Sequence, residues 1–378
     1  MTTVLDFLRP LVRCKSLTPN QAGALDFIEA VLKKLGFTCQ RLTFHKTENL
    51  YAVKGTSGPN FCFAGHVDVV SPLDETLWKH PPFKGVVHQD TIYGRGVVDM
   101  KGSIACYLKA LSDYLKNTSN LNHCLSFLIT SDEEGPAVDG TIKVVEWLKN
   151  NNVKLDLCIV GEPTSENTIG DTVKVGRRGS LNFHLKALGH EGHVAYPHKA
   201  LNPLTDLVAL LSQLKAHTFK EEYCLFAPTN LEIVSVNTKN EAFNIIPSTA
   251  EAKLNIRFTP SFQPCGLIQW IKKEATKFSC RFEIEAFSNA EAFYCNTPLL
   301  HEKLRECVYN AIDIRPKIST SGGTSDARFI KDLCPVFELG LKNETAHKID
   351  EHAPLKDLEI LTKIYSAILK SVEAGTFL

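Results

Sequence analysis

Two adjacent carboxylates, Glu133 and Glu134, are the side chains of this sequence best placed to do chemistry. They follow an apolar run at residues 125–129 that has the length and composition of a buried strand. Adjacent side chains at a strand end point in different directions, so one glutamate can face a metal ion while its neighbour faces water or substrate. An isolated acidic surface turn would have the same local sequence, so other segments must decide between the two interpretations.

Two further apolar segments end in the same way. Residues 61–64 lead into His66 and Asp68, and residues 155–160 lead into Glu162. His66 and Asp68 are expected on one face of the strand end, so that His66 can bind a metal while Asp68 orients the imidazole of His66. A histidine with a purely structural role is the alternative. Because ligand sites of open α/β sheets lie beyond the strand ends, the repeated pattern predicts one shared metal or acid–base site.

A glycine-rich segment, YGRGVVDMKG at residues 93–102, supplies another carboxylate. It lacks the GxGxxG spacing, and no acidic residue closes a following strand, which argues against a dinucleotide-binding loop. The glycines instead permit a sharp turn that presents Asp99 just before a helix predicted over residues 103–116. A carboxylate at that point could bridge two cations.

A late histidine completes a set of nitrogen and oxygen ligands, and spacing alone leaves His347 and His352 equally eligible. Imidazole with carboxylate suits Zn²⁺ or another divalent first-row ion better than Mg²⁺ or Ca²⁺. Two ions that share Asp99 could polarise a carbonyl and lower the pKa of a bridging water. Glu133 would take the proton of that water and pass it to a leaving amine, which describes hydrolysis of an amide.

The elements that must position these residues fall into two groups. The first is an α/β catalytic domain, a mixed sheet flanked by helices, at residues 1–178 and 296–378. The second, at residues 179–295, has the order βαββαβ and predicts an inserted ferredoxin-like α+β domain. Helices are expected at residues 3–14, 20–36, 140–149, 201–215, 265–278, 298–312 and 354–373, and strands at residues 51–54, 180–188, 231–236, 250–258, 280–285 and 336–339.

Composition limits the classes of function. The 378 residues include 42 basic and 42 acidic side chains, a balance that argues against nucleic acid or an anionic membrane as the main partner. The first residues alternate at helical spacing without a long apolar core, so neither a signal peptide nor an anchor is expected. The 12 cysteines are scattered without a CxxC pair, which favours reduced thiols and a cytoplasmic location.

Seven segments in this order, GHVDVV, YGRGVVDMKG, SDEEG, VGEPT, GHVAYPH, GGTSDARF and AHKIDE, resemble the dizinc peptidase and deacylase superfamily, which includes aminoacylases, carboxypeptidases and acetylornithine deacetylase. The resemblance covers nearly the whole chain and is greatest to the desuccinylase branch. It implies two Zn²⁺ ions per subunit, with Co²⁺ as a candidate substitute. The implied roles are a zinc site completed by His66 and Glu162, a second completed by Glu134 and His347, Asp99 as the bridge, Asp68 as support of His66, and Glu133 as the general base.

The same resemblance assigns roles to the insert and to a substrate. The insert would be a lid and the dimerisation surface of a homodimer, with His193 stabilising the oxyanion of the partner subunit and Tyr196 beside it. Without the resemblance, His193 and its neighbouring histidines would be polar residues of an exposed loop. The implied substrate is an acylated diamino acid with carboxylates at both ends, and the implied binding residues are Lys174, Arg178, Asn244, Arg257, Ser321, Gly322, Gly323, Thr324 and Ser325.

Two other functions remain open at this point. An acetylornithine deacetylase or related aminoacylase would use the same metals with a different acyl pocket. A non-catalytic metal-binding protein on this fold is the alternative from another class. Such a protein would be expected to lose the base, whereas Glu133 is present.

Overall fold

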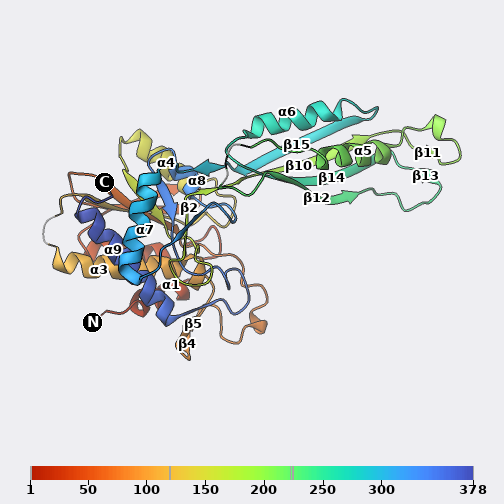
Figure 1. Ribbon diagram of the computed structural model, residues 1–378. Coiled ribbons are helices and arrows are strands. Elements are labelled where there is room, and N and C mark those ends of the chain that lie inside the picture. The colour runs from red at the N-terminus through yellow and green to blue at the C-terminus, as the bar shows by residue number, and fades with distance from the viewer. Residues whose placement is uncertain (1, 119–120, 222, 224, 378) are drawn as a thin grey trace. The chain divides into compact units, whose positions relative to one another are not determined.

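The computed structural model describes residues 2–118, 121–221, 223 and 225–377. The chain divides into two units, which Figure 1 shows as ribbons. Unit 1 contains Met1–Val175, Cys295–Ser319 and Ser325–Leu378, and unit 2 contains Gly176–Tyr294 and Thr320–Thr324. The short return segment at residues 320–324 was expected in the catalytic domain. It belongs to unit 2, where the Thr320 hydroxyl donates to the Leu225 carbonyl at 2.6 Å.

Unit 1 is built on an eight-stranded mixed sheet in the order β1-β2-β6-β3-β7-β18-β8-β17. The neighbours β6, β3, β7 and β18 run parallel, whereas β1, β2 and β6 pair antiparallel. The three central strands are almost wholly buried, as their apolar sequences predict. The strand bounds are β1 Thr38–Phe44, β2 Thr47–Lys54, β3 Asn60–His66, β6 Cys124–Thr130, β7 Leu157–Val160, β8 Thr172–Lys174, β17 Lys317–Ser319 and β18 Val336–Glu338.

Helices cover both faces of this sheet. On one face the Phe63 ring of β3 stacks on Tyr107 of α3 at 4.2 Å and meets Tyr365 of α9 edge-on at 5.6 Å. On the other face Trp147 of α4 packs 6.0 Å from Tyr51. The helix bounds are α1 Leu5–Arg13, α2 Ala24–Lys34, α3 Gly102–Asn117, α4 Thr141–Asn150, α7 Pro298–Ile312, α8 Ala327–Ile330 and α9 Leu355–Glu373. A smaller sheet joins β4 Val86–His88, β5 Thr91–Tyr93 and β19 His352–Pro354.

Unit 2 has the predicted βαββαβ order around its own core. Its antiparallel sheet runs β12-β14-β10-β15. Leucines of α5 and α6 pack on one face of this sheet against the alternating apolar residues of β10 and β14. The bounds are β10 Gly179–Leu188, α5 Pro203–Lys215, β12 Asn230–Asn237, β14 Thr249–Phe258, α6 Pro264–Ala275 and β15 Arg281–Ala290. Two further sheets have two short strands each: β9 Gly176–Arg177 pairs with β16 Phe293–Tyr294, and β11 Gly192–His193 pairs with β13 Ile245–Ile246.

Several predicted boundaries differ from the structure. The helix expected at residues 20–36 begins only at Ala24, because Gly23 has a φ of 88° and ends the preceding turn. The strand expected at residues 280–285 continues to Ala290. Strands β1, β4 and β5 were not predicted. Within the described residues, no helix combines the length and apolar character needed to cross a membrane.

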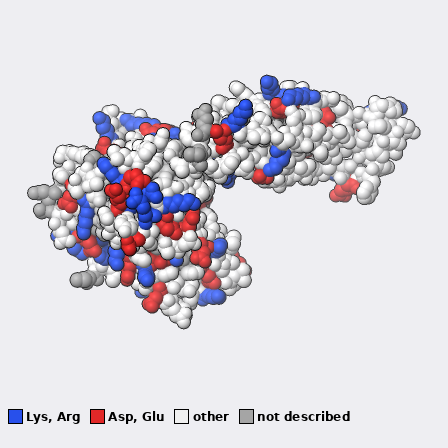
Figure 2. Space-filling view, viewed as in Figure 1, with Lys and Arg blue, Asp and Glu red and all other residues white. Residues whose placement is uncertain are grey.

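Charged side chains of both signs are intermixed on the visible face of the molecule (Figure 2). The sequence contains equal numbers of the two, 42 basic and 42 acidic residues. The described cysteines all carry free thiols.

Candidate active site

Three adjacent parallel strands of unit 1 deliver their last side chains to one place. Strand β3 ends on His66, β6 leads into Glu133 and Glu134, and β7 leads into Glu162. The register pairs His66 with Thr130 and Ala64 with Val160, so the three strands end at nearly the same level. The carboxyl ends of parallel strands therefore place these side chains together, as the sequence predicted.

Asp99 lies between two sets of ligand-type atoms. Its Oδ1 is 3.2 Å from His66 Nε2, and its Oδ2 is 3.3 Å from His347 Nε2. On the first side, Glu162 Oε1 lies 3.7 Å from His66 Nε2. On the second side, Glu134 Oε1 lies 2.8 Å from His347 Nε2. Each oxygen of one carboxylate thus faces a different histidine–glutamate pair.

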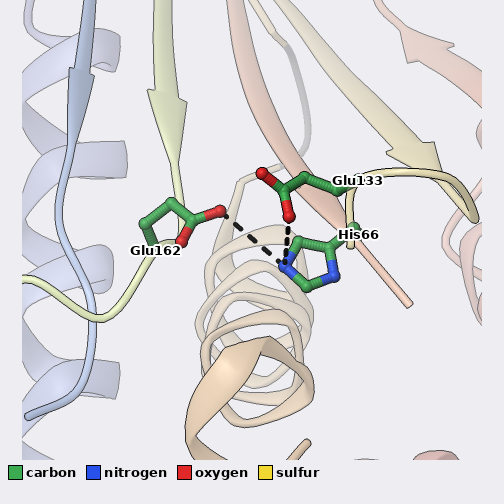
Figure 3. A group of neighbouring side chains, drawn as sticks. All are labelled: His66, Glu133 and Glu162. Atoms are coloured by element: carbon green, nitrogen blue, oxygen red, sulfur yellow. Dashed lines mark ion pairs between the residues drawn. The ribbon is translucent and has the colours of Figure 1, made fainter. Parts of the chain in front are cut away.

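Glu133 belongs to the same cluster and follows β6, whereas Glu162 follows β7. Figure 3 shows Glu133 and Glu162 approaching the same ring nitrogen of His66. Glu133 Oε2 is 4.0 Å from that Nε2. Ligand-type atoms of His66, Glu133 and Glu162 all lie within 4.8 Å of one another, and so do those of His66, Asp99 and Glu134.

The orientation of the His66 ring comes from the main chain. Its Nδ1 lies 2.9 Å from the carbonyl oxygen of Asp68, which can only accept, so Nδ1 donates and Nε2 is left as a ligand atom. The Asp68 carboxylate, expected to provide this contact, is 3.6 Å from Nδ1. It instead accepts the backbone N–H of Glu133 at 3.1 Å and of Glu134 at 3.0 Å. Asp68 therefore anchors the loop that carries both glutamates.

His347, and not His352, joins the cluster. His347 lies in a loop after β18, with its backbone in the left-handed conformation at a φ of 61°. The loop is closed by the Thr345 hydroxyl, which donates to the His352 carbonyl at 2.8 Å. The ring of His352 instead packs 5.1 Å from Tyr93 in the small sheet.

Two buried charges near the cluster were not identified from the sequence. Glu351 is fully buried and pairs with the equally buried Arg95 at 2.7 Å. The Glu351 carboxylate also accepts backbone N–H groups around Asp99. The available signal was its position in the AHKIDE segment, four residues after His347, but a lone acidic residue in a loop is usually a solvated surface charge.

Burial and neighbouring charges shift the pKa values of the carboxylates and histidines in this cluster. Burial raises the pKa of Glu133 and of Glu162 well above the usual range, and neighbouring carboxylates raise both further. Burial opposes a charge on His66, but the carboxylates of Asp99 and Glu133 outweigh it and raise its pKa. Hydrogen bonds to Asp99 and Glu134 raise the pKa of His347 to about 10. The cluster therefore favours any added positive charge.

This donor set fits divalent cations. Among the described residues, the buried Glu162 Oε1 has no hydrogen-bond partner, although buried carboxylate oxygens are normally paired. It points towards His66 Nε2, which carries a lone pair in the neutral ring because Nδ1 donates to Asp68. Two imidazoles and several carboxylates around one bridging aspartate are the ligand types that suit zinc and its first-row neighbours.

The predicted substrate residues of unit 1 are buried. The Lys174 ammonium lies 3.3 Å from the Ser319 hydroxyl and 3.6 Å from Glu166. Ser325 is fully buried and its hydroxyl donates to the buried carboxylate of Glu338. A contact of Ser325 with substrate would therefore be indirect, because its hydroxyl already has a partner.

The other predicted substrate residues lie in unit 2. His193, Tyr196 and Asn244 are exposed around the β11–β13 pair, and the His193 and Tyr196 rings are 5.9 Å apart. Arg178 donates to the Pro228 carbonyl at 2.9 Å and to Asn230 at 2.8 Å. Burial and the neighbouring positive charge of Arg257 lower the pKa of Arg178, so the two guanidinium groups are close enough to repel each other.

The glycine-rich turn of residues 321–324 contacts Arg177, which was not predicted as a site residue. Arg177 donates to the Ser321 carbonyl at 3.1 Å. Gly322 has a φ of 109°, and a side chain there would overlap the Arg177 guanidinium. The backbone conformation therefore favours glycine at this position, and any other residue would also displace the end of the Arg177 side chain. Gly323 has open space around it, and Thr324 is half-buried.

Comparison with known sequences gives consistent matches over nearly the whole chain. The profile of peptidase family M20/M25/M40 matches residues 62–371. A protein of Orientia tsutsugamushi (strain Boryong) named succinyl-diaminopimelate desuccinylase is 44% identical over 365 residues, which cover 96% of this chain and 94% of the relative. A protein of the same name from Caulobacter vibrioides (strain NA1000 / CB15N) is 44% identical over 370 residues, covering 97% and 95%.

Solved structures share the fold at low sequence identity. The M20 family metallo-carboxypeptidase Sso-CP2 from Sulfolobus solfataricus superposes with a TM-score of 0.79 at 19% identity, covering 99% of this chain and 100% of the other. The YXEP protein of Bacillus subtilis, described as a dinuclear metal-binding peptidase of the M20 family, gives a TM-score of 0.71 at 14% identity, with 98% of each chain covered.

Proposed function

Because the chain belongs to peptidase family M20/M25/M40, we propose that it hydrolyses N-succinyl-LL-2,6-diaminopimelate to succinate and LL-2,6-diaminopimelate. The reaction serves lysine and diaminopimelate synthesis, and a cytoplasmic location fits that role. The observation that carries the proposal is the position of Asp99 between two histidine–glutamate pairs, 3.2 and 3.3 Å from their nitrogens. The 44% identity to named desuccinylases supports the substrate.

The residues present would hold two metal ions, which we propose to be Zn²⁺, with Co²⁺ as a substitute. His66 and Glu162 would complete one site, Glu134 and His347 the other, and Asp99 would serve both. When bound, such ions polarise a carbonyl and make water more acidic. Two observations support this assignment: Glu162 Oε1 is unpaired among the described residues, and His66 donates through Nδ1, which directs Nε2 to the cluster.

Glu133 is proposed as the general base. A side-chain oxygen of Glu133 would accept a proton from the attacking water and deliver it to the nitrogen of the leaving amine as the amide bond breaks. Its backbone N–H donates to the Asp68 carboxylate, so the carboxyl group is held beside the cluster, with Oε2 4.0 Å from His66 Nε2. Asp68 and the main chain thus orient both the ligand His66 and the base.

Unit 2 supplies positive charge for a substrate with carboxylates at its ends. Arg178 and Arg257 are the proposed carboxylate ligands, because two mutually repelling guanidinium groups are relieved by a bound anion. The exposed turn of residues 321–324 offers backbone N–H donors above Arg177, and Asn244 offers an amide. Lys174 and Ser325 of unit 1 are proposed to contribute to substrate binding indirectly, through their buried contacts with Ser319 and Glu338.

We further propose a homodimer formed through unit 2. Within the described residues, β12 pairs with β14 on one side only, and it exposes Val234 to 63% and Val236 to 48%. Phe243 is fully exposed on the same unit, and Figure 2 shows few charged side chains towards the β11–β13 end. An open apolar edge strand favours pairing with a second copy. His193 would then assist the oxyanion of the partner subunit.

Hydrolysis of two amides tests the proposed substrate. The zinc-loaded protein and a metal-free control are assayed with N-succinyl-LL-2,6-diaminopimelate and with N-acetylornithine. We expect kcat/KM for the succinyl substrate to exceed that for the acetyl substrate by at least about 100-fold, because the distal carboxylate pairs with arginine. A preference for N-acetylornithine would assign a deacetylase, and the absence of turnover with either would favour a binding protein.

A further inference from the structure

The Glu351 carboxylate holds the segment that carries Asp99. Its Oε2 accepts the N–H of Gly96 at 2.9 Å and Nη1 of Arg95 at 2.7 Å. Its Oε1 accepts the N–H of Val98 at 2.7 Å and of Asp99 at 3.2 Å. Both oxygens are fully used, and the side chain is completely buried.

We propose that Glu351 is a positioning residue that fixes the backbone of Asp99 so that each oxygen of that aspartate faces one metal site. This inference rests on the metal pair of the proposed function. A bridging carboxylate must direct its two oxygens to two different centres, so a small rotation at Asp99 would disturb both sites together. The N–H contact from Asp99 itself to Glu351 Oε1 opposes such a rotation.

Glu351 also couples Asp99 to His347. Glu351 and His347 lie four positions apart in one loop. The backbone carbonyl of Glu351 accepts the N–H of Gly94 at 2.9 Å. Strand β19 begins at the next residue and pairs His352 with Tyr93 of β5. The segment of residues 347–351 therefore has two effects. The Glu351 side chain holds the backbone of Asp99, and the anchored backbone of the segment positions His347.

A carboxylate is required at this position for a chemical reason. All four contacts to Glu351 come from donors, and only an ionised carboxylate offers acceptors on both oxygens. Glutamine would place an NH₂ group against at least two of those donors. Arg95 balances the buried charge, and its guanidinium is 5.3 Å from the Trp78 ring and donates to the Ser71 carbonyl at 3.2 Å.

Metal titration of the metal-free protein tests the role of Glu351. We expect Glu351→Gln to weaken binding of Zn²⁺ by at least about tenfold and to alter the visible absorption of the Co²⁺-loaded protein. Hydrogen exchange of residues 94–99 in the metal-free variant should be faster than in the parent protein. If Glu351→Gln does not fold, Glu351→Asp, whose shorter carboxylate cannot reach both sets of donors, is titrated in its place and should lose affinity in the same direction.

Two control variants separate positioning from a general structural effect. Arg95→Lys disturbs the same buried ion pair but leaves the carboxylate contacts to the backbone, so it should retain most of the metal affinity and the Co²⁺ spectrum. Asp171→Asn removes a carboxylate that accepts three loop N–H groups, from residues 166 to 168, outside the cluster, and should bind metal normally. Equal losses in Glu351→Gln and Arg95→Lys, or an unchanged affinity in Glu351→Gln, would overturn the inference. A parent protein that binds fewer than two ions would overturn the proposed function itself.

Discussion

At the level of single residues, the buried carboxylates of the site have different contacts: some face the ligand atoms of the cluster, and others hold the backbone of its loops. Asp99 and Glu162 face Nε2 of His66, whereas Asp68 lies 3.6 Å from Nδ1 and accepts two backbone N–H groups. Burial raises the pKa of Asp68 to about 6, against the effect of His66 and those N–H groups. Residue type alone cannot distinguish these roles, because the direction of each side chain is set by the loop that carries it.

The general base can be separated from the metal ligands by substitution. Glu133→Gln keeps the size of the side chain but cannot accept a proton, so we expect kcat to fall by about 10²–10⁴-fold. Metal content, measured by elemental analysis, should remain that of the parent protein. Full activity in Glu133→Gln would remove Glu133 from the mechanism, and loss of metal would reassign it as a ligand.

Sequence reasoning was strongest for side chains that follow apolar runs. His66, Glu134 and Glu162 were predicted to converge, and the structure brings them together with Asp99. The choice between His347 and His352 could not be made from spacing, because neither the left-handed backbone at His347 nor the strand pairing of His352 with Tyr93 has a local sequence signature. Glu351 was missed because its burial depends on tertiary contacts with residues about 250 positions away.

At the scale of elements, the end of β7 is held by close backbone packing. A side chain at Gly340 would overlap the carbonyl oxygens of Gly161 and Glu162. Gly340→Ala should therefore displace the strand end, lower the free energy of unfolding by about 1–3 kcal/mol and weaken metal binding. Thermal unfolding and metal titration measure the two effects.

Gly266→Ala is the matched control for this substitution. Gly266 lies in α6 and has open space around it, so alanine should be neutral or stabilise the protein by about 0.4–1 kcal/mol. Equal stability of the two variants would show that the backbone at Gly340 can move without cost.

A buried histidine in the loop before β6 should make stability depend on pH. Burial lowers the pKa of His123 below its usual value of 6.5, so the unfolded chain binds a proton more readily than the folded one. The contribution of His123 to the free energy of unfolding is complete above about pH 6.5 and decreases as the pH falls below it. His123→Gln should flatten the loss of stability between about pH 7 and pH 5 in chemical unfolding of the metal-free protein. Parallel curves for both proteins would contradict this assignment.

Elements with apolar periodicity were predicted well, and those without it were not. The central strands and α7, for which residues 298–312 were expected and observed, carry strong patterns. Strand β1 has the sequence TCQRLTF and buries only Leu42 fully, because it lies at the edge of the sheet. Its strand conformation comes from pairing with β2, which a local pattern cannot reveal.

At the scale of the whole molecule, two separate cores explain why the sequence pattern changes near residue 178. The βαββαβ order of unit 2 was visible in the sequence because β10 and β14 alternate buried apolar residues with more exposed ones, and the apolar residues pack against α5 and α6. The outer edge of this sheet is not explained by packing within one chain, since β12 exposes four consecutive aliphatic or small side chains, from residue 233 to residue 236.

The proposed dimer gives a direct expectation for that edge. Val234→Lys would bring like charges together across a two-fold axis, so the dissociation constant of the dimer should rise by at least about tenfold. Light scattering coupled to size exclusion measures the change. Leu299→Lys is the control, because Leu299 is 73% exposed on α7 of unit 1 and should leave the dimer intact. A parent protein that is monomeric, or a variant that remains fully dimeric, would contradict the proposed interface.

The central claim is that one chain uses two metal ions to hydrolyse a succinylated diamino acid. Its most direct test is to titrate the metal-free protein with Zn²⁺ while measuring bound metal and the hydrolysis of N-succinyl-LL-2,6-diaminopimelate in the same samples. The account predicts no turnover without metal, and activity that rises to its maximum as two ions bind per chain. Turnover in the metal-free protein, or two bound ions without hydrolysis of this substrate, would contradict it.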